Sequence, residues 1–264
     1  MARGDQSKKI RWRLWLKVVL ACAALAVVIY TGRKVRQFLV SDPRFRLASV
    51  DAHGPGLSMD GVVHASRTRV LATFTEDFGR SIYLVPMAER RRRLLAVDWV
   101  EDASIARIWP NRLAVRIKER KPVAFVNLPI PGGRTSRVML IDGEGVLLEP
   151  PAQSHFTFPV LSGITEDQTE IERRQRVEAM LRLLDDLGPA GKNISEVNAA
   201  TPENLIIVTQ IEGRAIELVM GNQNFSRRLQ SFLDHYPEIQ RQSINARAFD
   251  LRLDDRITAG ARER

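Results

Sequence analysis

The chain has 264 residues and carries 40 lysines and arginines against 31 aspartates and glutamates, which gives a formal net charge of +9. The whole excess lies in residues 1–46, where eleven basic and two acidic side chains surround one hydrophobic segment, and this position favours a membrane flank over a nucleic-acid-binding domain. Only one cysteine, Cys22, is present, which excludes an intrachain disulfide and a cysteine-based metal site.

Residues 14–32 form a hydrophobic segment that predicts one membrane-spanning helix, because a bilayer core requires about 20 apolar residues. Trp12, Trp15 and Tyr30 fall at interfacial depths, where aromatic side chains are enriched. The alternative is a cleaved signal peptide, but the basic and bulky sequence TGRKVRQF follows in place of a small-residue cleavage site. Both flanks are basic, so the positive-inside rule favours an inside N-terminus by a small margin. We expect three segments here: a cytoplasmic tail at 1–13, the span at 14–32 and a linker at 33–44.

The next elements indicate a small α+β domain at residues 45–119. They follow the order strand, helix, helix, strand, strand, at 45–54, 68–78, 86–97, 99–108 and 112–119. The last two strands should form a hairpin that reverses at Pro110 and Asn111. Their alternation predicts a buried set and a solvated set: Leu113, Val115 and Ile117 against the helices, Arg116 and Lys118 in water. The successive arginines at 90–93 permit an anion-binding patch, but a solvated helix face is the favoured interpretation.

Longer β structure with two helices indicates a second, mainly antiparallel β domain at residues 120–258, before a short tail at 259–264. Its strands are expected at 122–127, 137–142, 145–149, 204–210 and 215–221, with a tight turn at 142–145. Helices at 166–187 and 224–235 should bury two stripes: Ile171, Val177, Leu181, Leu184 and Leu187, then Phe225, Leu229, Phe232 and Leu233. In the last strand, at 247–255, Phe249, Leu251 and Leu253 alternate with Asp250, Arg252 and Asp254.

Known catalytic and cofactor motifs are absent from the sequence. It contains no GxGxxG, P-loop or GxSxG pattern, and GPAGKN at 188–193 lacks the spacing and final hydroxyl of a P-loop. Neighbouring acids such as Asp185 and Asp186 diverge by about 100° on a helix, so they form no carboxylate dyad. The four histidines are scattered. We therefore expect no catalytic residue, no cofactor, no metal and no small-molecule substrate.

Three separated motifs resemble the bacterial FtsQ/DivIB family of cell-division proteins. VDWVEDASIARIWPNRLAVRIKERKPVAF resembles the family pattern PWV, A.V.R.WP..L.V.I.E..PVA, with Asp98 in the usual place of proline. VMGNQNFSRRLQSFLDHYPEI resembles LG..NF..KL..F...Y, and AFDLRLDDRITA resembles the closing DLRY..G.AV strand. The resemblance extends from the anchor nearly to the end of the sequence. It implies a single N-terminal transmembrane helix, a small POTRA domain with β-α-α-β-β order and a larger, mainly antiparallel β domain with two helices.

The family resemblance also implies partners and a location. It implies a non-catalytic scaffold at the division septum in the cell inner membrane, with its bulk in the periplasm. Its implied partners are FtsB and FtsL, with FtsW/FtsI and FtsK through the POTRA domain. In the family FtsB adds a strand to the sheet end, and the final strand here has no sequence partner after it. The matching positions are Ala248, Phe249, Asp250, Leu251, Arg252, Leu253, Asp254, Asp255, Arg256, Ile257 and Thr258.

The sequence departs from the family pattern at two positions, and two alternative functions remain open. Leu253 replaces a common aromatic residue, and Arg256 lies near the expected glycine, so the side-chain specificity toward the partner is open. Arg252 is the expected contact to an acidic partner residue, with a plain surface ion pair as the alternative. The first alternative function is a membrane-anchored periplasmic protein of another POTRA class. The second is a tethered periplasmic enzyme, which a catalytic constellation in a cleft would favour.

Overall fold

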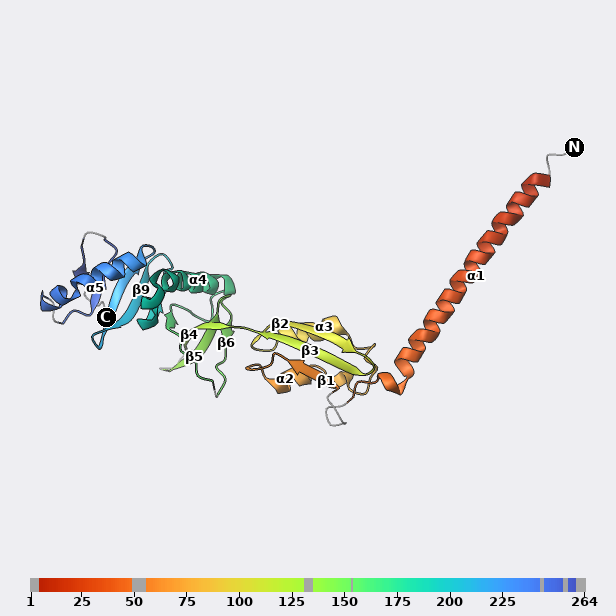
Figure 1. Ribbon diagram of the computed structural model, residues 1–264, viewed down its shortest axis with the longest axis horizontal. Helices are drawn as coiled ribbons and strands as arrows, with labels where there is room; N and C mark the ends of the chain where they lie inside the picture. The colour runs from red at the N-terminus through yellow and green to blue at the C-terminus, as the bar shows by residue number, and fades with distance from the viewer. Residues whose placement is uncertain are drawn as a thin grey trace. The chain divides into compact units, whose positions relative to one another are not determined.

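The computed structural model describes residues 5–48, 56–130, 135–152, 154–242, 245–253 and 256–259. The chain divides into two compact units, Met1–Glu119 and Arg120–Arg264. The first contains a long helix followed by a small sheet with helices, and the second contains a larger sheet with two long helices (Figure 1).

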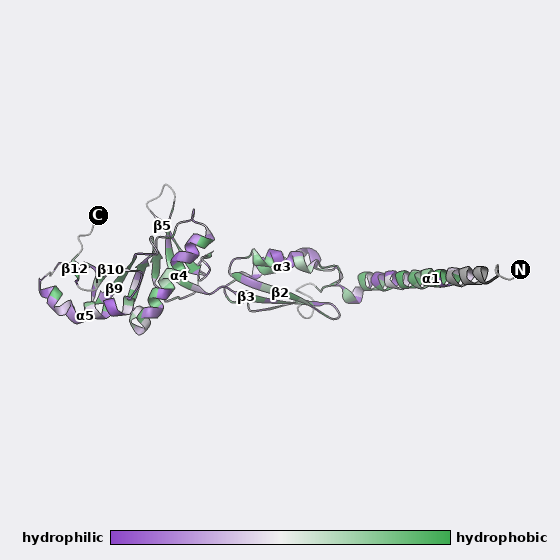
Figure 2. Ribbon diagram, turned by 90° about the horizontal axis from the view of Figure 1, so that it is seen from above, coloured by the Kyte–Doolittle hydropathy of each residue, from purple (hydrophilic) through white to green (hydrophobic). Residues whose placement is uncertain are grey.

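Helix α1 spans Asp5–Ser41 and is the one helix of the described residues that is long and apolar enough to cross a membrane. Its candidate span, Trp15–Ser41, has no buried residue, and Figure 2 shows it mostly in hydrophobic colours with hydrophilic residues toward its C-terminal end. The segment expected as a linker at 33–44 is helical as far as Ser41. Pro43 restricts the residue before it to an extended backbone, so the helix stops there and the 3₁₀ turn η1 (Pro43–Phe45) begins.

The first unit has the predicted order of one strand, two helices and two strands. Its elements are β1 (Leu57–Asp60), α2 (Arg67–Ala72), the 3₁₀ turn η2 (Thr75–Asp77), α3 (Met87–Leu95), β2 (Val100–Ile108) and β3 (Arg112–Glu119). The sheet order is β1-β3-β2, with β1 parallel and β2 antiparallel to β3. The predicted hairpin and its register are confirmed: Leu113, Val115 and Ile117 are buried, while Arg116 and Lys118 are exposed.

Two elements of the first unit differ from the sequence prediction. The strand expected at 45–54 is wrong in its described part, because Arg46 makes only an isolated bridge to Ser81 and the strand lies at β1. Burial does alternate in this segment, since Phe45 and Leu47 are buried. It arises because an extended segment packs on the core without pairing as a strand. The helix expected at 68–78 ends at Ala72, where the Thr73 hydroxyl donates to the Arg69 carbonyl and a 3₁₀ turn follows.

The arginine run forms a solvated face at Arg91, Arg92 and Arg93, as expected, but Arg90 on α3 is an exception. Its side chain is 2% exposed, and its Nε donates to Asp77 Oδ2 at 2.6 Å. Its Nη2 donates to Asp77 Oδ1 at 3.1 Å and to Glu76 at 3.0 Å. These carboxylates, that of Asp77 first, raise the pKa of Arg90. Helix periodicity turns one of the four arginines inward while Arg92 stays exposed.

Glu119, the last residue of β3, fastens a loop to the sheet. Its carboxylate accepts backbone N–H groups of Val63 at 2.7 Å and of His64 and Ala65 at 2.8 Å each. His64 Nδ1 lies 3.1 Å away, and its ring stacks on Trp99. Burial alone would raise the pKa of Glu119, but the hydrogen bonds from Ala65, Val63 and His64 together bring it below its usual value. The ionised carboxylate is therefore part of the folded unit.

We expect Glu119→Gln to destabilise the first unit at pH 7 by about 1.5–3 kcal/mol, the range for hydrogen bonds to a charged group. Because the folded pKa lies below the unfolded one, the carboxylate contribution is complete above the unfolded pKa and is lost as pH falls through the folded pKa. Thermal unfolding of wild type and variant from pH 7 to pH 3 measures this. The two unfolding temperatures should converge at the acid end, and a constant difference would contradict the prediction.

The second unit is built on one nine-stranded sheet of order β12-β11-β10-β9-β8-β7-β4-β5-β6. The strands are β4 (Pro122–Pro129), β5 (Ser136–Asp142), β6 (Leu147–Leu148), β7 (Val160–Ser162), β8 (Ile194–Asn198), β9 (Leu205–Ile211), β10 (Arg214–Gly221), β11 (Ala248–Asp250) and β12 (Thr258–Ala259). The helices are α4 (Glu170–Leu187) and α5 (Phe225–Gln242), and a 3₁₀ turn η3 (Gly188–Asn193) follows α4. Both helices pack on the apolar core of the sheet. The predicted turn at 142–145 is confirmed between β5 and β6.

The sequence prediction missed strands β7 and β8 and misplaced parts of both helices. Helix α4 begins at Glu170 because Thr169 and Glu172 form a capping box. Its buried face runs through Met180 and Leu183, whereas Ile171 and Leu181 are exposed. Helix α5 does not stop before Pro237 but continues to Gln242, and Tyr236 takes the buried place expected for Leu233. Pro237 lacks the backbone N–H that would donate a hydrogen bond within the helix. The helix nevertheless continues past it, because this buries Tyr236 beside Phe232.

Candidate docking site at the β12 edge of the sheet

The predicted strand at 247–255 is wrong as one continuous element. Only Ala248–Asp250 forms β11, the described residues 251–253 and 256–257 belong to no strand, and Thr258–Ala259 forms β12. β11 pairs in parallel with β10 and antiparallel with β12, so β12 forms the outer edge on this side of the sheet. Of the predicted docking residues, Thr258 is therefore at the edge and Ala248, Phe249 and Asp250 lie one strand inside it. Asp254 and Asp255 lie outside the described residues.

The hydrogen bonds between β11 and β10 determine which backbone N–H and C=O groups of β12 point away from the sheet. The Arg247 carbonyl accepts from Glu217 and the Leu251 amide donates to Val219, so odd-numbered residues of β11 face β10. Because a strand alternates its bonding direction, Asp250 faces β12 and the pair Asp250–Thr258 exchanges the backbone bonds. The neighbouring residues Ile257 and Ala259 then direct their amide and carbonyl groups away from the sheet. These groups lie along the outer side of β12.

Side-chain packing holds β11 rigidly beneath α5. Phe249 and Leu251 are each 2% exposed, as the alternation predicted, and the Phe249 ring lies 5.1 Å from that of Phe232. Leu253 departs from the predicted pattern, since it is 51% exposed. The chain has left the sheet at that point, so the alternation that buries Phe249 and Leu251 no longer applies to it. An exposed leucine therefore stands beside the edge strand.

Arg252 forms an ion pair with Asp250 within the chain, while its side chain stays 52% exposed. Its Nε lies 3.0 Å from each Asp250 carboxylate oxygen, and its Nη2 donates to Asp250 Oδ2 at 2.6 Å. The Arg252 guanidinium lowers the pKa of Asp250, and the carboxylate in turn raises the pKa of Arg252. Arg228 on α5 donates to the carbonyls of Met220 at 2.6 Å and Arg252 at 2.8 Å. The two arginines thus hold the segment after β11 against α5 and β10.

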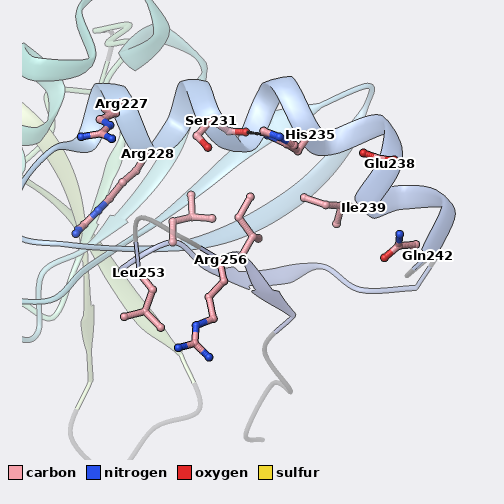
Figure 3. A pocket seen from close by; sticks show the side chains of 11 residues that line it. Arg227, Arg228, Ser231, His235, Glu238, Ile239, Gln242, Leu253 and Arg256 are labelled. Atoms are coloured by element: carbon pink, nitrogen blue, oxygen red, sulfur yellow. Dashed lines mark hydrogen bonds between the residues drawn. The ribbon is translucent and has the colours of Figure 1, made fainter.

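A cavity of about 400 Å³ lies between α5 and the segment that joins β11 to β12 (Figure 3). Its lining from α5 comprises Arg227, Arg228, Ser231, His235, Glu238, Ile239 and Gln242. Its lining from the joining segment comprises Leu251, Leu253, Arg256 and Ile257. The lining includes the apolar side chains of Ile239, Leu251, Leu253 and Ile257, and its charged members are mainly basic, with Glu238 as the acidic one. The cavity suits an apolar partner side chain flanked by an acidic one.

Sequence reasoning placed the expected docking site on the last strand and did not include α5. The sequence contained an indication that α5 lies near this strand, because α5 is amphipathic and ends a few residues before β11. The structure brings residues of α5 to the same cavity as Leu253, Arg256 and Ile257. Within the described part of the chain, no group of three or more metal-binding side chains is present.

Comparison with known proteins matches both units to one family. Residues 133–252 match the family model described as cell division protein FtsQ/DivIB, C-terminal, and residues 57–120 match the model described as POTRA domain, FtsQ-type. The chain is 34% identical over 220 residues to the cell division protein FtsQ of Koribacter versatilis, with 81% of this chain and 60% of that protein covered.

Two further relatives bear the same name. The FtsQ of Coxiella burnetii is 26% identical, with 58% of this chain and 56% of that protein covered. The FtsQ of Shewanella oneidensis is 22% identical, with 97% and 89% covered. The chain thus spans about three fifths of the length of the first two relatives. With both family models in chain order over most of its length, the chain belongs to the FtsQ/DivIB family of bacterial cell division proteins.

Proposed function

We propose that the chain is a non-catalytic scaffold of the cell division machinery, held in the cell inner membrane by α1 with residues 1–13 in the cytoplasm. Both folded units then lie outside the cytoplasm and act at the division septum. The apolar length of α1 and the membership in the FtsQ/DivIB family support the membrane anchor. The basic flanks of the span support the orientation by the small margin noted above.

We propose further that the β12 edge binds FtsB, a membrane protein with a coiled coil, and through it FtsL. The observation that carries this proposal is the outward row of backbone groups at Ile257 and Ala259, adjacent to the cavity under α5. Strand addition satisfies such groups by main-chain hydrogen bonds, each of which contributes about 0.5–1.5 kcal/mol net. The exposed Leu253 and the basic lining add side-chain contacts to an apolar and an acidic residue of the incoming segment. As a scaffold, the chain would then recruit FtsW/FtsI, and it would recruit FtsK through the POTRA unit.

Pull-down of the full chain from a detergent extract of membranes tests this function. The expected result is retention of the small bitopic pair FtsB and FtsL by the wild-type chain. A chain that ends after Leu251, and so lacks β12 and the joining segment, is the matched control and should retain neither. Equal retention by both chains would place the docking site elsewhere.

Leu253 offers a side-chain test of the same site. We expect Leu253→Asp to weaken binding to an FtsB peptide about 5-fold, because covering the exposed half of a leucine side chain contributes about 1 kcal/mol. The melting temperature should stay unchanged, since the side chain lies outside the core. Val138→Asp on β5 is the control, because Val138 is similarly exposed (49%) but lies near the opposite edge of the sheet. Titration calorimetry with both variants checks this, and equal weakening by both would contradict it.

A further inference from the structure

Exposed aromatic and apolar side chains gather at one end of the first unit. Trp109, at the turn between β2 and β3, is 71% exposed, and its neighbour Ile108 is 37% exposed. Tyr83 and Leu84, in the loop before α3, are 38% and 48% exposed. Large apolar groups in water are unfavourable, so a cluster of this kind marks a surface that is covered by something else. We call these four residues the aromatic patch.

Arg107 joins the two halves of the aromatic patch. Its Nε donates to the Ile82 carbonyl at 2.6 Å and its Nη2 to the Val85 carbonyl at 3.0 Å. The guanidinium therefore bonds on both sides of Tyr83 and Leu84. The hairpin turn with Ile108 and Trp109 is held at the same end of the unit as the loop.

The same end of the unit is fastened to the last turns of α1. The Ser81 hydroxyl donates to the Leu39 carbonyl at 2.7 Å, and the Ile82 amide donates to the Phe45 carbonyl at 2.9 Å. The Phe45 ring lies between those of Phe38 and Tyr83, with centroid distances of 5.6 and 5.5 Å. The contacts place the aromatic patch next to the segment where α1 ends, at Ser41.

Basic side chains surround this end of the unit. They are Arg33, Lys34, Arg36, Arg44, Arg46, Arg80 and Arg112, all exposed. The acid of residues 33–48 is Asp42, and its carboxylate is paired with Arg44 at 2.8 Å. A basic surface beside a membrane span attracts anionic lipid headgroups. Tryptophan and tyrosine favour the same interfacial layer, because their rings are apolar with one polar group.

We propose that the aromatic patch inserts into the headgroup layer of an anionic membrane, with Trp109 as the deepest side chain. This inference rests on the proposed membrane anchor, because α1 brings the patch to the bilayer. The patch gives the first unit a second attachment to the membrane and restrains its orientation about the end of α1. Anionic lipid is the occupant that both the aromatic composition and the surrounding charge favour.

Site-specific fluorescence on the full chain in liposomes tests the proposal. Cys22, the one cysteine, is replaced by serine, and an environment-sensitive dye is attached at Asn111→Cys beside Trp109. The control dye is at Lys118→Cys, which lies about 20 Å further along β3 and is likewise exposed. The quencher is a nitroxide on the lipid headgroup, in liposomes of phosphatidylcholine with or without phosphatidylglycerol. Dye on the native Cys22 reports whether α1 is inserted.

The expected result is quenching at 111 in the phosphatidylglycerol liposomes, weaker quenching without that lipid and none at 118. Adding Trp109→Ser should abolish the quenching at 111. Absence of quenching at 111 while the Cys22 dye is shielded within the bilayer would overturn the patch and leave the anchor intact. A Cys22 dye that remains in water would overturn both. Burial of the dye at 111 only after addition of other membrane proteins would assign the patch to a protein partner and overturn the lipid proposal.

Discussion

Ala259→Pro is expected to raise the dissociation constant for an FtsB peptide about 5- to 150-fold while the chain stays folded. The outward backbone N–H of Ala259 is removed, which leaves a carbonyl of the incoming strand without its donor and costs about 1–3 kcal/mol. The fold should tolerate the change because the missing N–H belongs to an edge strand and makes no bond within the sheet. Ala259 is also exposed, so no core packing is lost.

Two variants sharpen this test. Ala259→Val keeps the N–H and should bind as the wild type does. Thr258→Pro removes the N–H that faces β11, so it should release β12 from the sheet and weaken binding through loss of the edge itself. Fluorescence anisotropy with a labelled peptide measures all three, and circular dichroism confirms that they are folded. Wild-type affinity in folded Ala259→Pro would show that no strand is added at this residue.

Arg90→Ala is expected to destabilise the first unit by about 3–5 kcal/mol, the cost of leaving a buried carboxylate without its partner. Asp77 is 1% exposed, and its bonds to Arg90 would have no replacement from water. Arg92→Ala is the matched control on the same helix, because Arg92 is exposed, and it should change stability by about 0.5 kcal/mol or less.

The double variant Arg90→Met with Asp77→Leu separates the pair from the packing around it. Replacement of both charges by apolar side chains of similar volume is expected to restore most of the stability that Arg90→Ala loses. Scanning calorimetry of the first-unit transition measures this. A double variant as unstable as Arg90→Ala would show that the loss comes from packing and not from the unpaired charge.

The fold followed from the sequence wherever periodicity was strong. The hairpin β2–β3 was predicted with its register, because its buried alternation of Leu113, Val115 and Ile117 is uninterrupted. The first helix was predicted from the length of its apolar segment, although it continues to Ser41. Arg90 was misjudged because a run of arginines carries no information on which member points inward. Its partner Asp77 lies on a separate 3₁₀ turn, so only the tertiary fold reveals the pair.

The sequence indicates a final strand in this region but not how that strand pairs. Residues 247–255 alternate as a strand would, yet only Ala248–Asp250 forms a strand paired with β10, and the described residues 251–253 lie outside it. The return of Thr258–Ala259 as β12 involves two residues, too few for a periodic signal. The cavity joins side chains of α5 to those of the joining segment, and the sequence separates these elements. Sequence patterns therefore indicate that a strand lies here. Which of its residues direct their backbone groups outward can be told only from the strand pairing in the structure.

Photocrosslinking in living cells tests the docking claim most directly. A photoreactive phenylalanine analogue replaces Thr258 on β12 in one strain and Arg137 on β5 in another, where the Arg137 side chain is 51% exposed near the opposite edge of the sheet. The docking edge predicts a covalent adduct with FtsB from position 258 and none from position 137. An FtsB adduct from position 137, with none from position 258, would contradict it.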